Sequence, residues 1–220
     1  MNSLRKRGAS ARTAQSKSQP IVLEPYAFSS LVMAAIEIHG KESLGFLIGH
    51  KDRQFVEGRV TDCISVHAAY PVQSADRRRT MVGFGNLAAR KRAEETIRAV
   101  GFEIIGGFHS HPNGSARLSA GDNDVILEEL DTVYSKVGLN QWLEIVIGVR
   151  KITRPRSSLG LRKLFRRGKV PSPGFYPWDV GPEIAGDVLI TPKMAFRIKM
   201  SGYGFEKDKV REVLLCYSRY

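Results

Sequence analysis

A short apolar run that ends in two histidines constrains this chain more than any other feature of its sequence. Residues 102–108 (FEIIGGF) are rich in β-branched and aromatic side chains and predict a buried strand, and His109-Ser110-His111 follows directly. Side chains two residues apart on a strand point to the same side, so His109 and His111 project together while Ser110 points away. Residues 112–114 (PNG) then end the strand.

A second polar pair opens the next predicted element. Ser119 and Asp122 stand at the start of a helix-like stretch over about 119–137. A carboxylate in the first turn of this helix can reach back to the strand end and complete a three-ligand cup with His109 and His111. Two imidazoles and one carboxylate suit zinc, and three protein ligands leave a fourth position open for water. Ser119 and Asp122 are equally typical of a helix capping box, and the two roles can coexist.

One acidic residue far upstream gives these residues a context. Glu42 begins the stretch Glu42-Ser43-Leu44-Gly45-Phe46-Leu47-Ile48-Gly49, in which 44–48 reads as a strand. With this glutamate the chain resembles the JAMM (MPN+) metalloprotease family. The family signature is an early Glu, then His-[Ser/Thr]-His, seven residues, Ser, two residues and Asp. All of its residues occur here at the right spacing, and the resemblance covers about residues 22–150.

The resemblance implies a role for each signature residue. His109, His111 and Asp122 correspond to the zinc ligands, and Zn²⁺ is the implied cofactor. Zinc lowers the pKa of bound water to about 7, which makes hydroxide available near neutral pH. Glu42 corresponds to the general base, which takes the proton of water and later protonates the leaving amine. Ser119 corresponds to the side chain that donates a hydrogen bond to the developing oxyanion.

The resemblance also implies a substrate class. Active JAMM proteins hydrolyse amide or isopeptide bonds at the C-terminus of ubiquitin or ubiquitin-like proteins, so the expected function is that of a zinc isopeptidase (deubiquitinase-like) acting on such conjugates. Parts of the family require a partner protein subunit, which is a second expected contact. The two cysteines, Cys63 and Cys216, form no disulfide framework. With no transmembrane run and no secretory signal, we expect a cytoplasmic protein without membrane contact.

The remaining pattern predicts an α/β (α+β) body, a curved mixed β-sheet flanked by helices, as in the JAMM fold. Three segments have helical character, and several short β-branched or apolar runs have strand character. The helices are expected at Tyr26–Ile38, Asn86–Val100 and about 119–137, and the strands at 44–48, Val56–Val66, Thr80–Phe84, 102–108, Leu143–Val149, Met194–Met200 and Val213–Tyr217.

Positive charge is concentrated in two segments. The chain has 34 Lys and Arg against 22 Asp and Glu, but residues 1–19 carry five of the cations and 151–170 carry eight, both without an acid. We therefore expect a basic disordered tail over 1–19 and a single catalytic domain over 20–220, near neutral apart from its basic segment.

The Pro-rich segment at about 151–192 is expected to form an ordered insertion with a basic start. Its six prolines argue against a helix or a central strand, although Leu159–Phe165 could form one short amphipathic turn. Part of it, 151–180, is a candidate surface for the modifier or a partner protein. Contact with nucleic acid is the less favoured reading, and a plain solvated loop is the third.

Two other functions remain open from the sequence. A RadC-like, DNA-associated protein would share the His-x-His…Ser-x-x-Asp pattern, and the basic segments would suit it. A non-catalytic MPN scaffold would keep the motif while holding Glu42 or the metal unproductively. The context of Glu42 favours the zinc isopeptidase.

Overall fold

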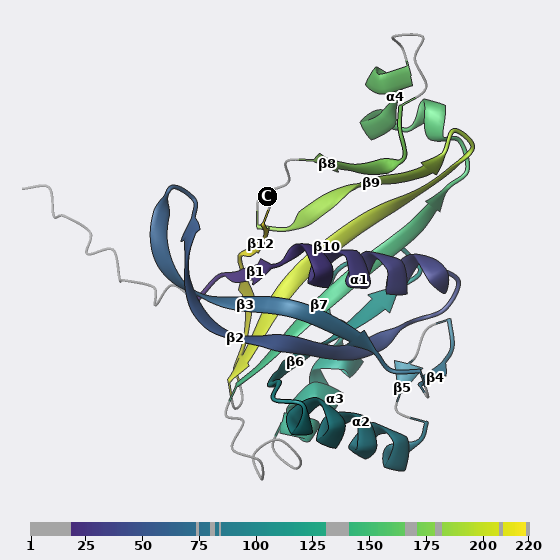
Figure 1. Cartoon of the computed structure of the whole chain (residues 1–220). Coiled ribbons are helices and arrows are strands. Elements are labelled where there is room, and N and C mark those ends of the chain that lie inside the picture. Colours follow the sequence, from purple (N-terminus) through teal and green to yellow (C-terminus); the bar gives the residue numbers. More distant parts are fainter. Residues whose placement is uncertain are drawn as a thin grey trace, which may run out of the picture.

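A ten-stranded mixed sheet runs through the centre of the molecule (Figure 1). The computed structural model describes residues 19–73, 75–79, 82–83, 85–130, 141–165, 171–178, 182–206 and 209–218. The strands are β1 (Ile21–Leu23), β2 (Leu44–Val56), β3 (Arg59–Pro71), β6 (Ile104–His111), β7 (Gln141–Ile152), β8 (Gly174–Trp178), β9 (Ile184–Thr191), β10 (Met194–Glu206), β11 (Lys209–Val213) and β12 (Leu215–Tyr217). Their order is β12-β1-β3-β2-β6-β7-β10-β9-β8, and β11 pairs with β10. A separate two-stranded sheet joins β4 (Asp76–Arg77) to β5 (Val82–Gly83).

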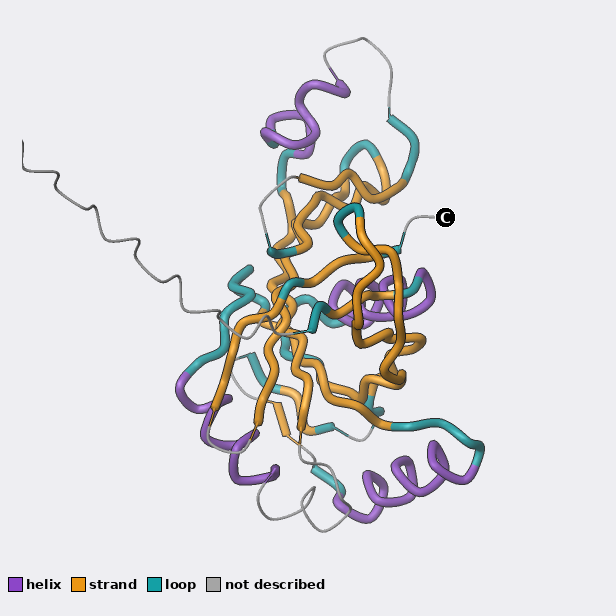
Figure 2. Tube along the Cα trace, turned by 90° about the vertical axis from the view of Figure 1, so that its left-hand side faces the viewer, coloured by secondary structure: helices purple, strands orange, loops and turns teal. Residues whose placement is uncertain are grey.

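Helices lie on both sides of this sheet (Figure 2). Helix α1 (Pro25–Glu37) packs on one face through Leu31 and Ala35, against apolar residues of β3 and β7. On the opposite face, α2 (Leu87–Ala99) and α3 (Ala120–Glu129) cover a second apolar cluster. A short helix, α4 (Leu159–Phe165), follows a 3₁₀ turn at Pro155–Ser157 and packs on β8 and β9.

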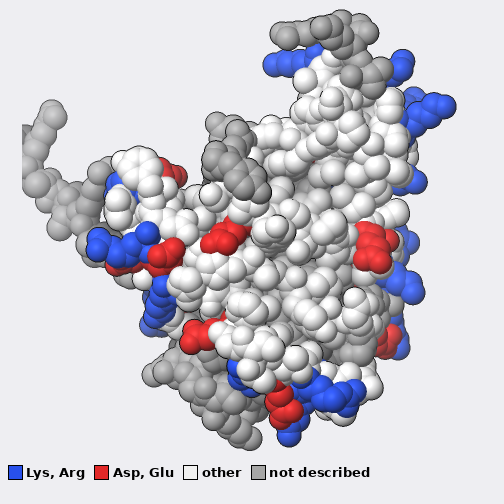
Figure 3. Space-filling view, in the orientation of Figure 1, with Lys and Arg blue, Asp and Glu red and all other residues white. Residues whose placement is uncertain are grey.

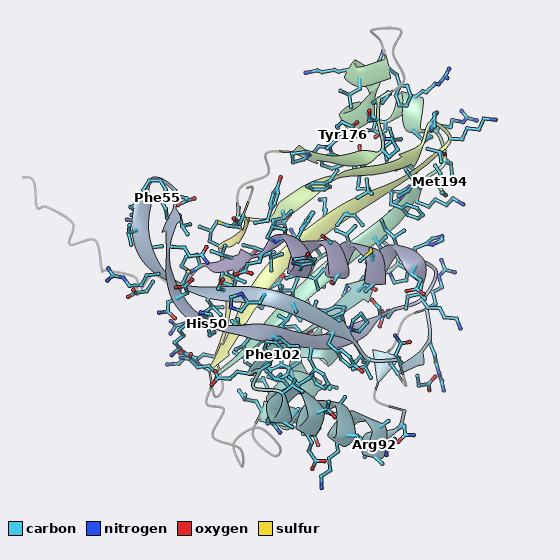
Figure 4. All side chains as sticks on the ribbon, in the orientation of Figure 1. His50, Phe55, Arg92, Phe102, Tyr176 and Met194 are labelled. Atoms are coloured by element: carbon cyan, nitrogen blue, oxygen red, sulfur yellow. The ribbon has the colours of Figure 1, made fainter. Side chains whose placement is uncertain are left out.

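The apolar start of β2 is explained by this double coverage. Leu44, Phe46 and Ile48 belong to the cluster under α2 and α3, whereas Leu47 belongs to the cluster under α1. A strand that is buried on both faces needs apolar side chains at consecutive positions. Beyond the sheet, β2 and β3 continue as a hairpin whose turn residues Glu57 and Gly58 both have positive φ, and Phe55 lies near its tip (Figure 4).

Most expected elements are present, with shifted ends. The first helix runs over Pro25–Glu37, and the second runs over Leu87–Ala99 with Asn86 as its N-cap. The third is described only to Leu130, so the rest of the expected 119–137 helix lies outside the described residues, as do residues 1–18 of the expected tail and parts of Thr80–Phe84. The expected strand at Val56–Val66 is wrong at its start, because the β2–β3 turn occupies Glu57 and Gly58.

The expectation that 151–192 holds no central strand is wrong. Strand β9 lies between β8 and β10 and is buried over Ile184–Leu189. No proline falls within β9, since Pro182 precedes it and Pro192 follows it. Pro177 lies in β8, which is the last strand in the order of the sheet, and edge strands tolerate proline. The possible short amphipathic turn at Leu159–Phe165 is present as the seven-residue helix α4, so the segment holds a short helix as well.

Basic side chains gather at the end of the molecule that carries α4, on the face shown in Figure 3. Residues 145–178 contain no Asp or Glu. The exposed cations of this basic end are Arg150, Lys151, Arg154, Arg156, Arg162 and Lys163, with Lys193 in the β9–β10 turn. Among the described helices, none is long and apolar enough to cross a membrane.

Candidate metal centre

The two histidines lie at the carboxyl end of β6, on the side of the sheet covered by α2 and α3. Their rings are 4.9 Å apart between centroids, and both side chains are buried. Ser110 alternates away from them, and its hydroxyl bonds to Ser43 instead. The expected projection of His109 and His111 to one side is therefore observed.

Asp122 caps its helix and faces the histidines at the same time. The Ser119 N–H donates to Asp122 Oδ2 at 2.7 Å, and the Asp122 N–H donates to Ser119 Oγ at 3.1 Å, which forms a capping box. The same Oδ2 lies 3.5 Å from His109 Nε2 and 3.6 Å from His111 Nε2. The capping-box interpretation of Ser119 and Asp122 is therefore confirmed, and the Asp122 carboxylate also lies close to both histidines, as the expected three-ligand cup requires.

The donor set fits a zinc ion. The ligand atoms of His109, His111 and Asp122 lie within 4.8 Å of one another. Tetrahedral zinc with bonds of about 2.0–2.2 Å holds its ligand atoms about 3.3–3.6 Å apart, which matches the 3.5 and 3.6 Å separations of Asp122 from the histidines. His109 Nε2 is buried and makes no hydrogen bond, a costly arrangement that a metal at this point would relieve.

The charges of these residues are strongly coupled. Burial disfavours the charged form of His109, but the nearby carboxylates of Asp122 and Glu144 outweigh it and raise the pKa of the imidazole to about 10 in the metal-free protein. Burial alone would raise the pKa of Asp122, yet the two neighbouring histidines hold it well below its usual range. A carboxylate that stays ionised is the state that a metal requires.

Glu42 is held beside these residues by the start of β2. It is buried, and its backbone N–H donates to Arg78 O at 2.8 Å. Burial raises the pKa of the Glu42 carboxyl above 4.5, and the nearby His111 and His109 offset part of that rise. A raised pKa is typical of a carboxylate that acts as a proton acceptor near neutral pH.

A pair of serines fixes Glu42 relative to the histidines. Ser43 donates to Ser110 Oγ from its backbone N–H at 2.9 Å and from its hydroxyl at 2.8 Å. The Ser110 N–H returns a bond to Ser43 O at 2.8 Å. Because Ser43 follows Glu42 and Ser110 separates the histidines, these bonds set the spacing between the two parts of the signature.

Glu144 is a buried residue of this centre that the sequence interpretation missed. Its Oε1 lies 2.8 Å from His109 Nδ1, and its Oε2 accepts a hydrogen bond from Trp142 Nε1 at 2.9 Å. A signal was present in the sequence, because Glu144 is the one charged residue in the apolar strand 142–149. A lone carboxylate in a buried strand needs a partner, and His109 is that partner.

A groove of about 590 Å³ leads away from the histidines between α2 and α3. Its rim carries two exposed apolar side chains, Leu87 and Val125. Arg90, at its base, pairs with Glu129 of α3 and Glu94 of α2 and so ties the two helices together. The groove is lined by Glu42, Leu44, Gly45, Phe46, Gly83, Leu87, Arg90, Gly107, Phe108, His109, Ser119, Gly121, Asp122, Val125, Ile126, Glu129, Trp142 and Glu144.

Fold and site together define an α+β domain of the JAB/MPN class, with a His–His–Asp centre at the end of a sheet strand. Residues 25–158 match the family described as prokaryotic homologs of the JAB domain, and the chain belongs to this family. The fold is similar to the solution structure of protein DSY2949 from Desulfitobacterium hafniense, with a TM-score of 0.52 and 16% identity over 91% of this chain and 94% of that one. A search of curated proteins found no match.

Proposed function

We propose that this protein is a zinc-dependent peptidase that cleaves the amide or isopeptide bond at the C-terminus of ubiquitin or a ubiquitin-like modifier. The observation that carries the proposal is the complete set of buried His109 and His111, facing Asp122, with Glu42 lining the same groove. A family that includes hydrolases supports it. A scaffold would have no need of a buried carboxylate with a raised pKa beside a complete ligand set.

His109, His111 and Asp122 would hold the zinc ion, which when bound supplies an acidified water and polarises the scissile carbonyl. Glu42 accepts the proton of the attacking water and passes it to the leaving amine. Ser119 Oγ already accepts from the Asp122 N–H, so its own hydroxyl proton is free to be donated to the oxyanion.

The groove supports a substrate with an extended tail. Leu87 and Val125 are exposed along it, so it offers such a segment apolar contacts. A flexible C-terminal tail of a modifier has this form, and the lysine ε-amine or α-amine beyond it would be the leaving group. The basic end around α4 is the part of the chain that we propose for contact with the modifier body or with a partner subunit.

A paired assay of metal binding and turnover tests the proposal. Glu42→Gln should bind zinc as the wild type does and lose cleavage of a ubiquitin-like protein fused at its C-terminus, measured by mass spectrometry. Glu37→Gln, at the exit of α1, serves as the charge-matched control and should keep both. Cleavage by Glu42→Gln at the wild-type rate would show that the base is misassigned.

The proposed contact of the basic end has its own test. Exchanging Arg156 and Lys163 for Glu should weaken binding of an inactive Glu42→Gln chain to the conjugate, and the loss should shrink at high salt. Salt-dependent retention of DNA by the wild type, with no effect of the exchange on conjugate binding, would favour the DNA-associated alternative.

A further inference from the structure

The buried carboxylate of Glu144 stands behind His109, on the side of the ring that faces away from Asp122. Its Oε1 is 2.8 Å from His109 Nδ1, whereas Asp122 Oδ2 is 3.5 Å from Nε2 of the same ring. Glu144 is therefore bonded to the ring nitrogen opposite the ligand nitrogen. It is 5% exposed, so water does not compete with this contact.

We propose that Glu144 is a positioning residue of the metal centre, and that Trp142 holds it in place. This inference rests on the zinc site of the proposed function. A carboxylate only accepts hydrogen bonds, so its contact with Nδ1 requires the proton of His109 to sit there and leaves Nε2 as the metal-binding atom. A carboxylate behind a ligand histidine fixes the ring orientation and makes the imidazole a better donor to metal.

Trp142 restrains the carboxylate from its other side. The two residues are two apart on β7 and point to the same side of the sheet, where Trp142 Nε1 donates to Glu144 Oε2 at 2.9 Å. Both oxygens of Glu144 are therefore occupied by N–H donors, one from the indole and one from the imidazole. An indole is a rigid donor, so the carboxylate has little freedom to turn away from His109.

Gly107 provides the space in which this pair lies. It is the register partner of Glu144 in the parallel β6–β7 pair. A Cβ atom at position 107 would lie 2.8 Å from Glu144 Oε2 and 2.9 Å from Trp142 Cζ2, both closer than such atoms approach. Glycine at this position, two residues before His109, is thus part of the same arrangement.

The first test is the zinc affinity of the full chain, measured by competition with a chromophoric chelator. Glu144→Gln keeps the size of the side chain and removes its charge, and we expect zinc to bind about 10- to 100-fold more weakly. Glu95→Gln removes an equal charge from an exposed pair with Lys91 and should leave zinc affinity unchanged. Wild-type affinity in Glu144→Gln would overturn the inference.

The role of Trp142 is tested by a double-mutant cycle. Trp142→Phe keeps most of the ring and removes the N–H donor, so it should weaken zinc binding by less than Glu144→Gln does. In the Glu144→Gln background it should have little further effect, because it acts through the lost carboxylate. Simple addition of the two losses would overturn the assigned order Trp142–Glu144–His109.

Thermal unfolding of the metal-free variants separates positioning from packing. A residue that only fills space would lower the Tm of the metal-free chain and leave the zinc affinity of the folded chain intact, which would overturn the inference. The proposed function can fail separately from this inference. If the wild-type chain binds no zinc, the proposed metal centre itself is wrong. If the wild type binds one zinc per chain and Glu144→Gln binds zinc equally well, only the positioning role of Glu144 is wrong.

Discussion

The Asp122 carboxylate completes the helix cap and faces the two histidines with the same oxygen atom. Oδ2 accepts from the Ser119 N–H and faces both histidine Nε2 atoms at 3.5 and 3.6 Å. The helix cap therefore aims the ligand, and a change at Asp122 affects both. We expect Asp122→Ala to lose zinc and also about 1 kcal/mol of folding free energy through the lost cap.

Asp122→Asn separates these effects. The amide oxygen still accepts from the Ser119 N–H, so the folding free energy of the metal-free chain should change little, whereas zinc affinity should fall with the loss of the anionic ligand. Calorimetry measures the zinc affinity, and urea unfolding of the metal-free chain measures the folding free energy. If Asp122→Asn and Asp122→Ala lost the same folding free energy and the same zinc affinity, the dual role of Asp122 would be contradicted.

Ser119 carries a prediction of its own. The Ser110 hydroxyl is bonded to Ser43, whereas the Ser119 hydroxyl lines the groove, so Ser119→Ala should reduce kcat/KM by about 100-fold or more while zinc stays bound. Ser115→Ala, in the preceding loop, is the control. Unchanged turnover in Ser119→Ala would assign oxyanion stabilisation to another group.

The titration of Glu42 follows from its burial and from the charges beside it. In the metal-free chain, burial raises the pKa of its carboxyl above 4.5, and the nearby histidines offset part of that rise. Zinc beside Glu42 would favour the ionised form, so removal of zinc should shift the titration of Glu42 to higher pH. NMR titration of the metal-free and zinc-loaded chains measures this shift, and a Glu42 pKa at or below 4.5 in the metal-free chain would contradict the burial argument.

At the scale of elements, the bonds between Ser43, at the start of β2, and Ser110, at the end of β6, hold Glu42 in place relative to the histidines. Ser110 Oγ accepts both donors of Ser43, the neighbour of Glu42. Ser110→Ala removes this acceptor and shifts Glu42 relative to the zinc water. Since a misplacement of about 1 Å can cost about 100-fold, we expect a fall in kcat of about 10- to 100-fold with zinc affinity retained.

Ser29→Ala, on the exposed side of α1, is the control and should leave both kcat and zinc affinity unchanged. Loss of zinc together with activity in Ser110→Ala would mean that Ser110 supports the ligands rather than the base.

The sequence predicted the site better than it predicted the C-terminal half of the sheet. His109 and His111 follow from strand periodicity, and Asp122 from the helix start, because these are local rules. Glu42 entered through the family signature alone, since its approach to the histidines depends on long-range pairing of β2 with β6. Glu144 was missed for the same reason, because it reaches His109 across two strands.

Strand β9 was missed because composition was averaged over a long segment. The segment 151–192 contains six prolines, but none of them lies within Ile184–Thr191. The side chains of this run point alternately to the two faces of the sheet. Position relative to each proline, rather than their number, decides whether a strand forms.

At the scale of the whole molecule, hydrogen bonds of Ser158 join the segment before α4 to an ion pair between β9 and β10. Asp187 of β9 is fully buried and accepts from Ser158 Oγ at 3.0 Å and from Arg197 Nε at 3.3 Å. Arg197 also stacks on Trp178, 4.4 Å from the ring centroid. Arg197→Met leaves the Asp187 charge with fewer partners and should cost about 2 kcal/mol, since Arg197 is itself partly exposed.

Urea unfolding measures this cost. The exposed Lys193→Met in the β9–β10 turn is the control and should change the free energy of unfolding by less than about 0.5 kcal/mol. If the sheet unfolds as one unit, Arg197→Met should also lower the urea concentration at which zinc is released. Zinc release that stays at the wild-type denaturant concentration would show that the metal centre folds independently of β9.

The most direct test of the central claim is cleavage of a ubiquitin-like protein conjugated at its C-terminus, before and after removal of zinc. We predict cleavage at the terminal amide bond, its loss when a chelator strips the metal, and its return when zinc is added to the wild type but not to Glu42→Gln. Cleavage that persists without metal, or zinc bound at one per chain with no cleavage of any such conjugate, would contradict the account.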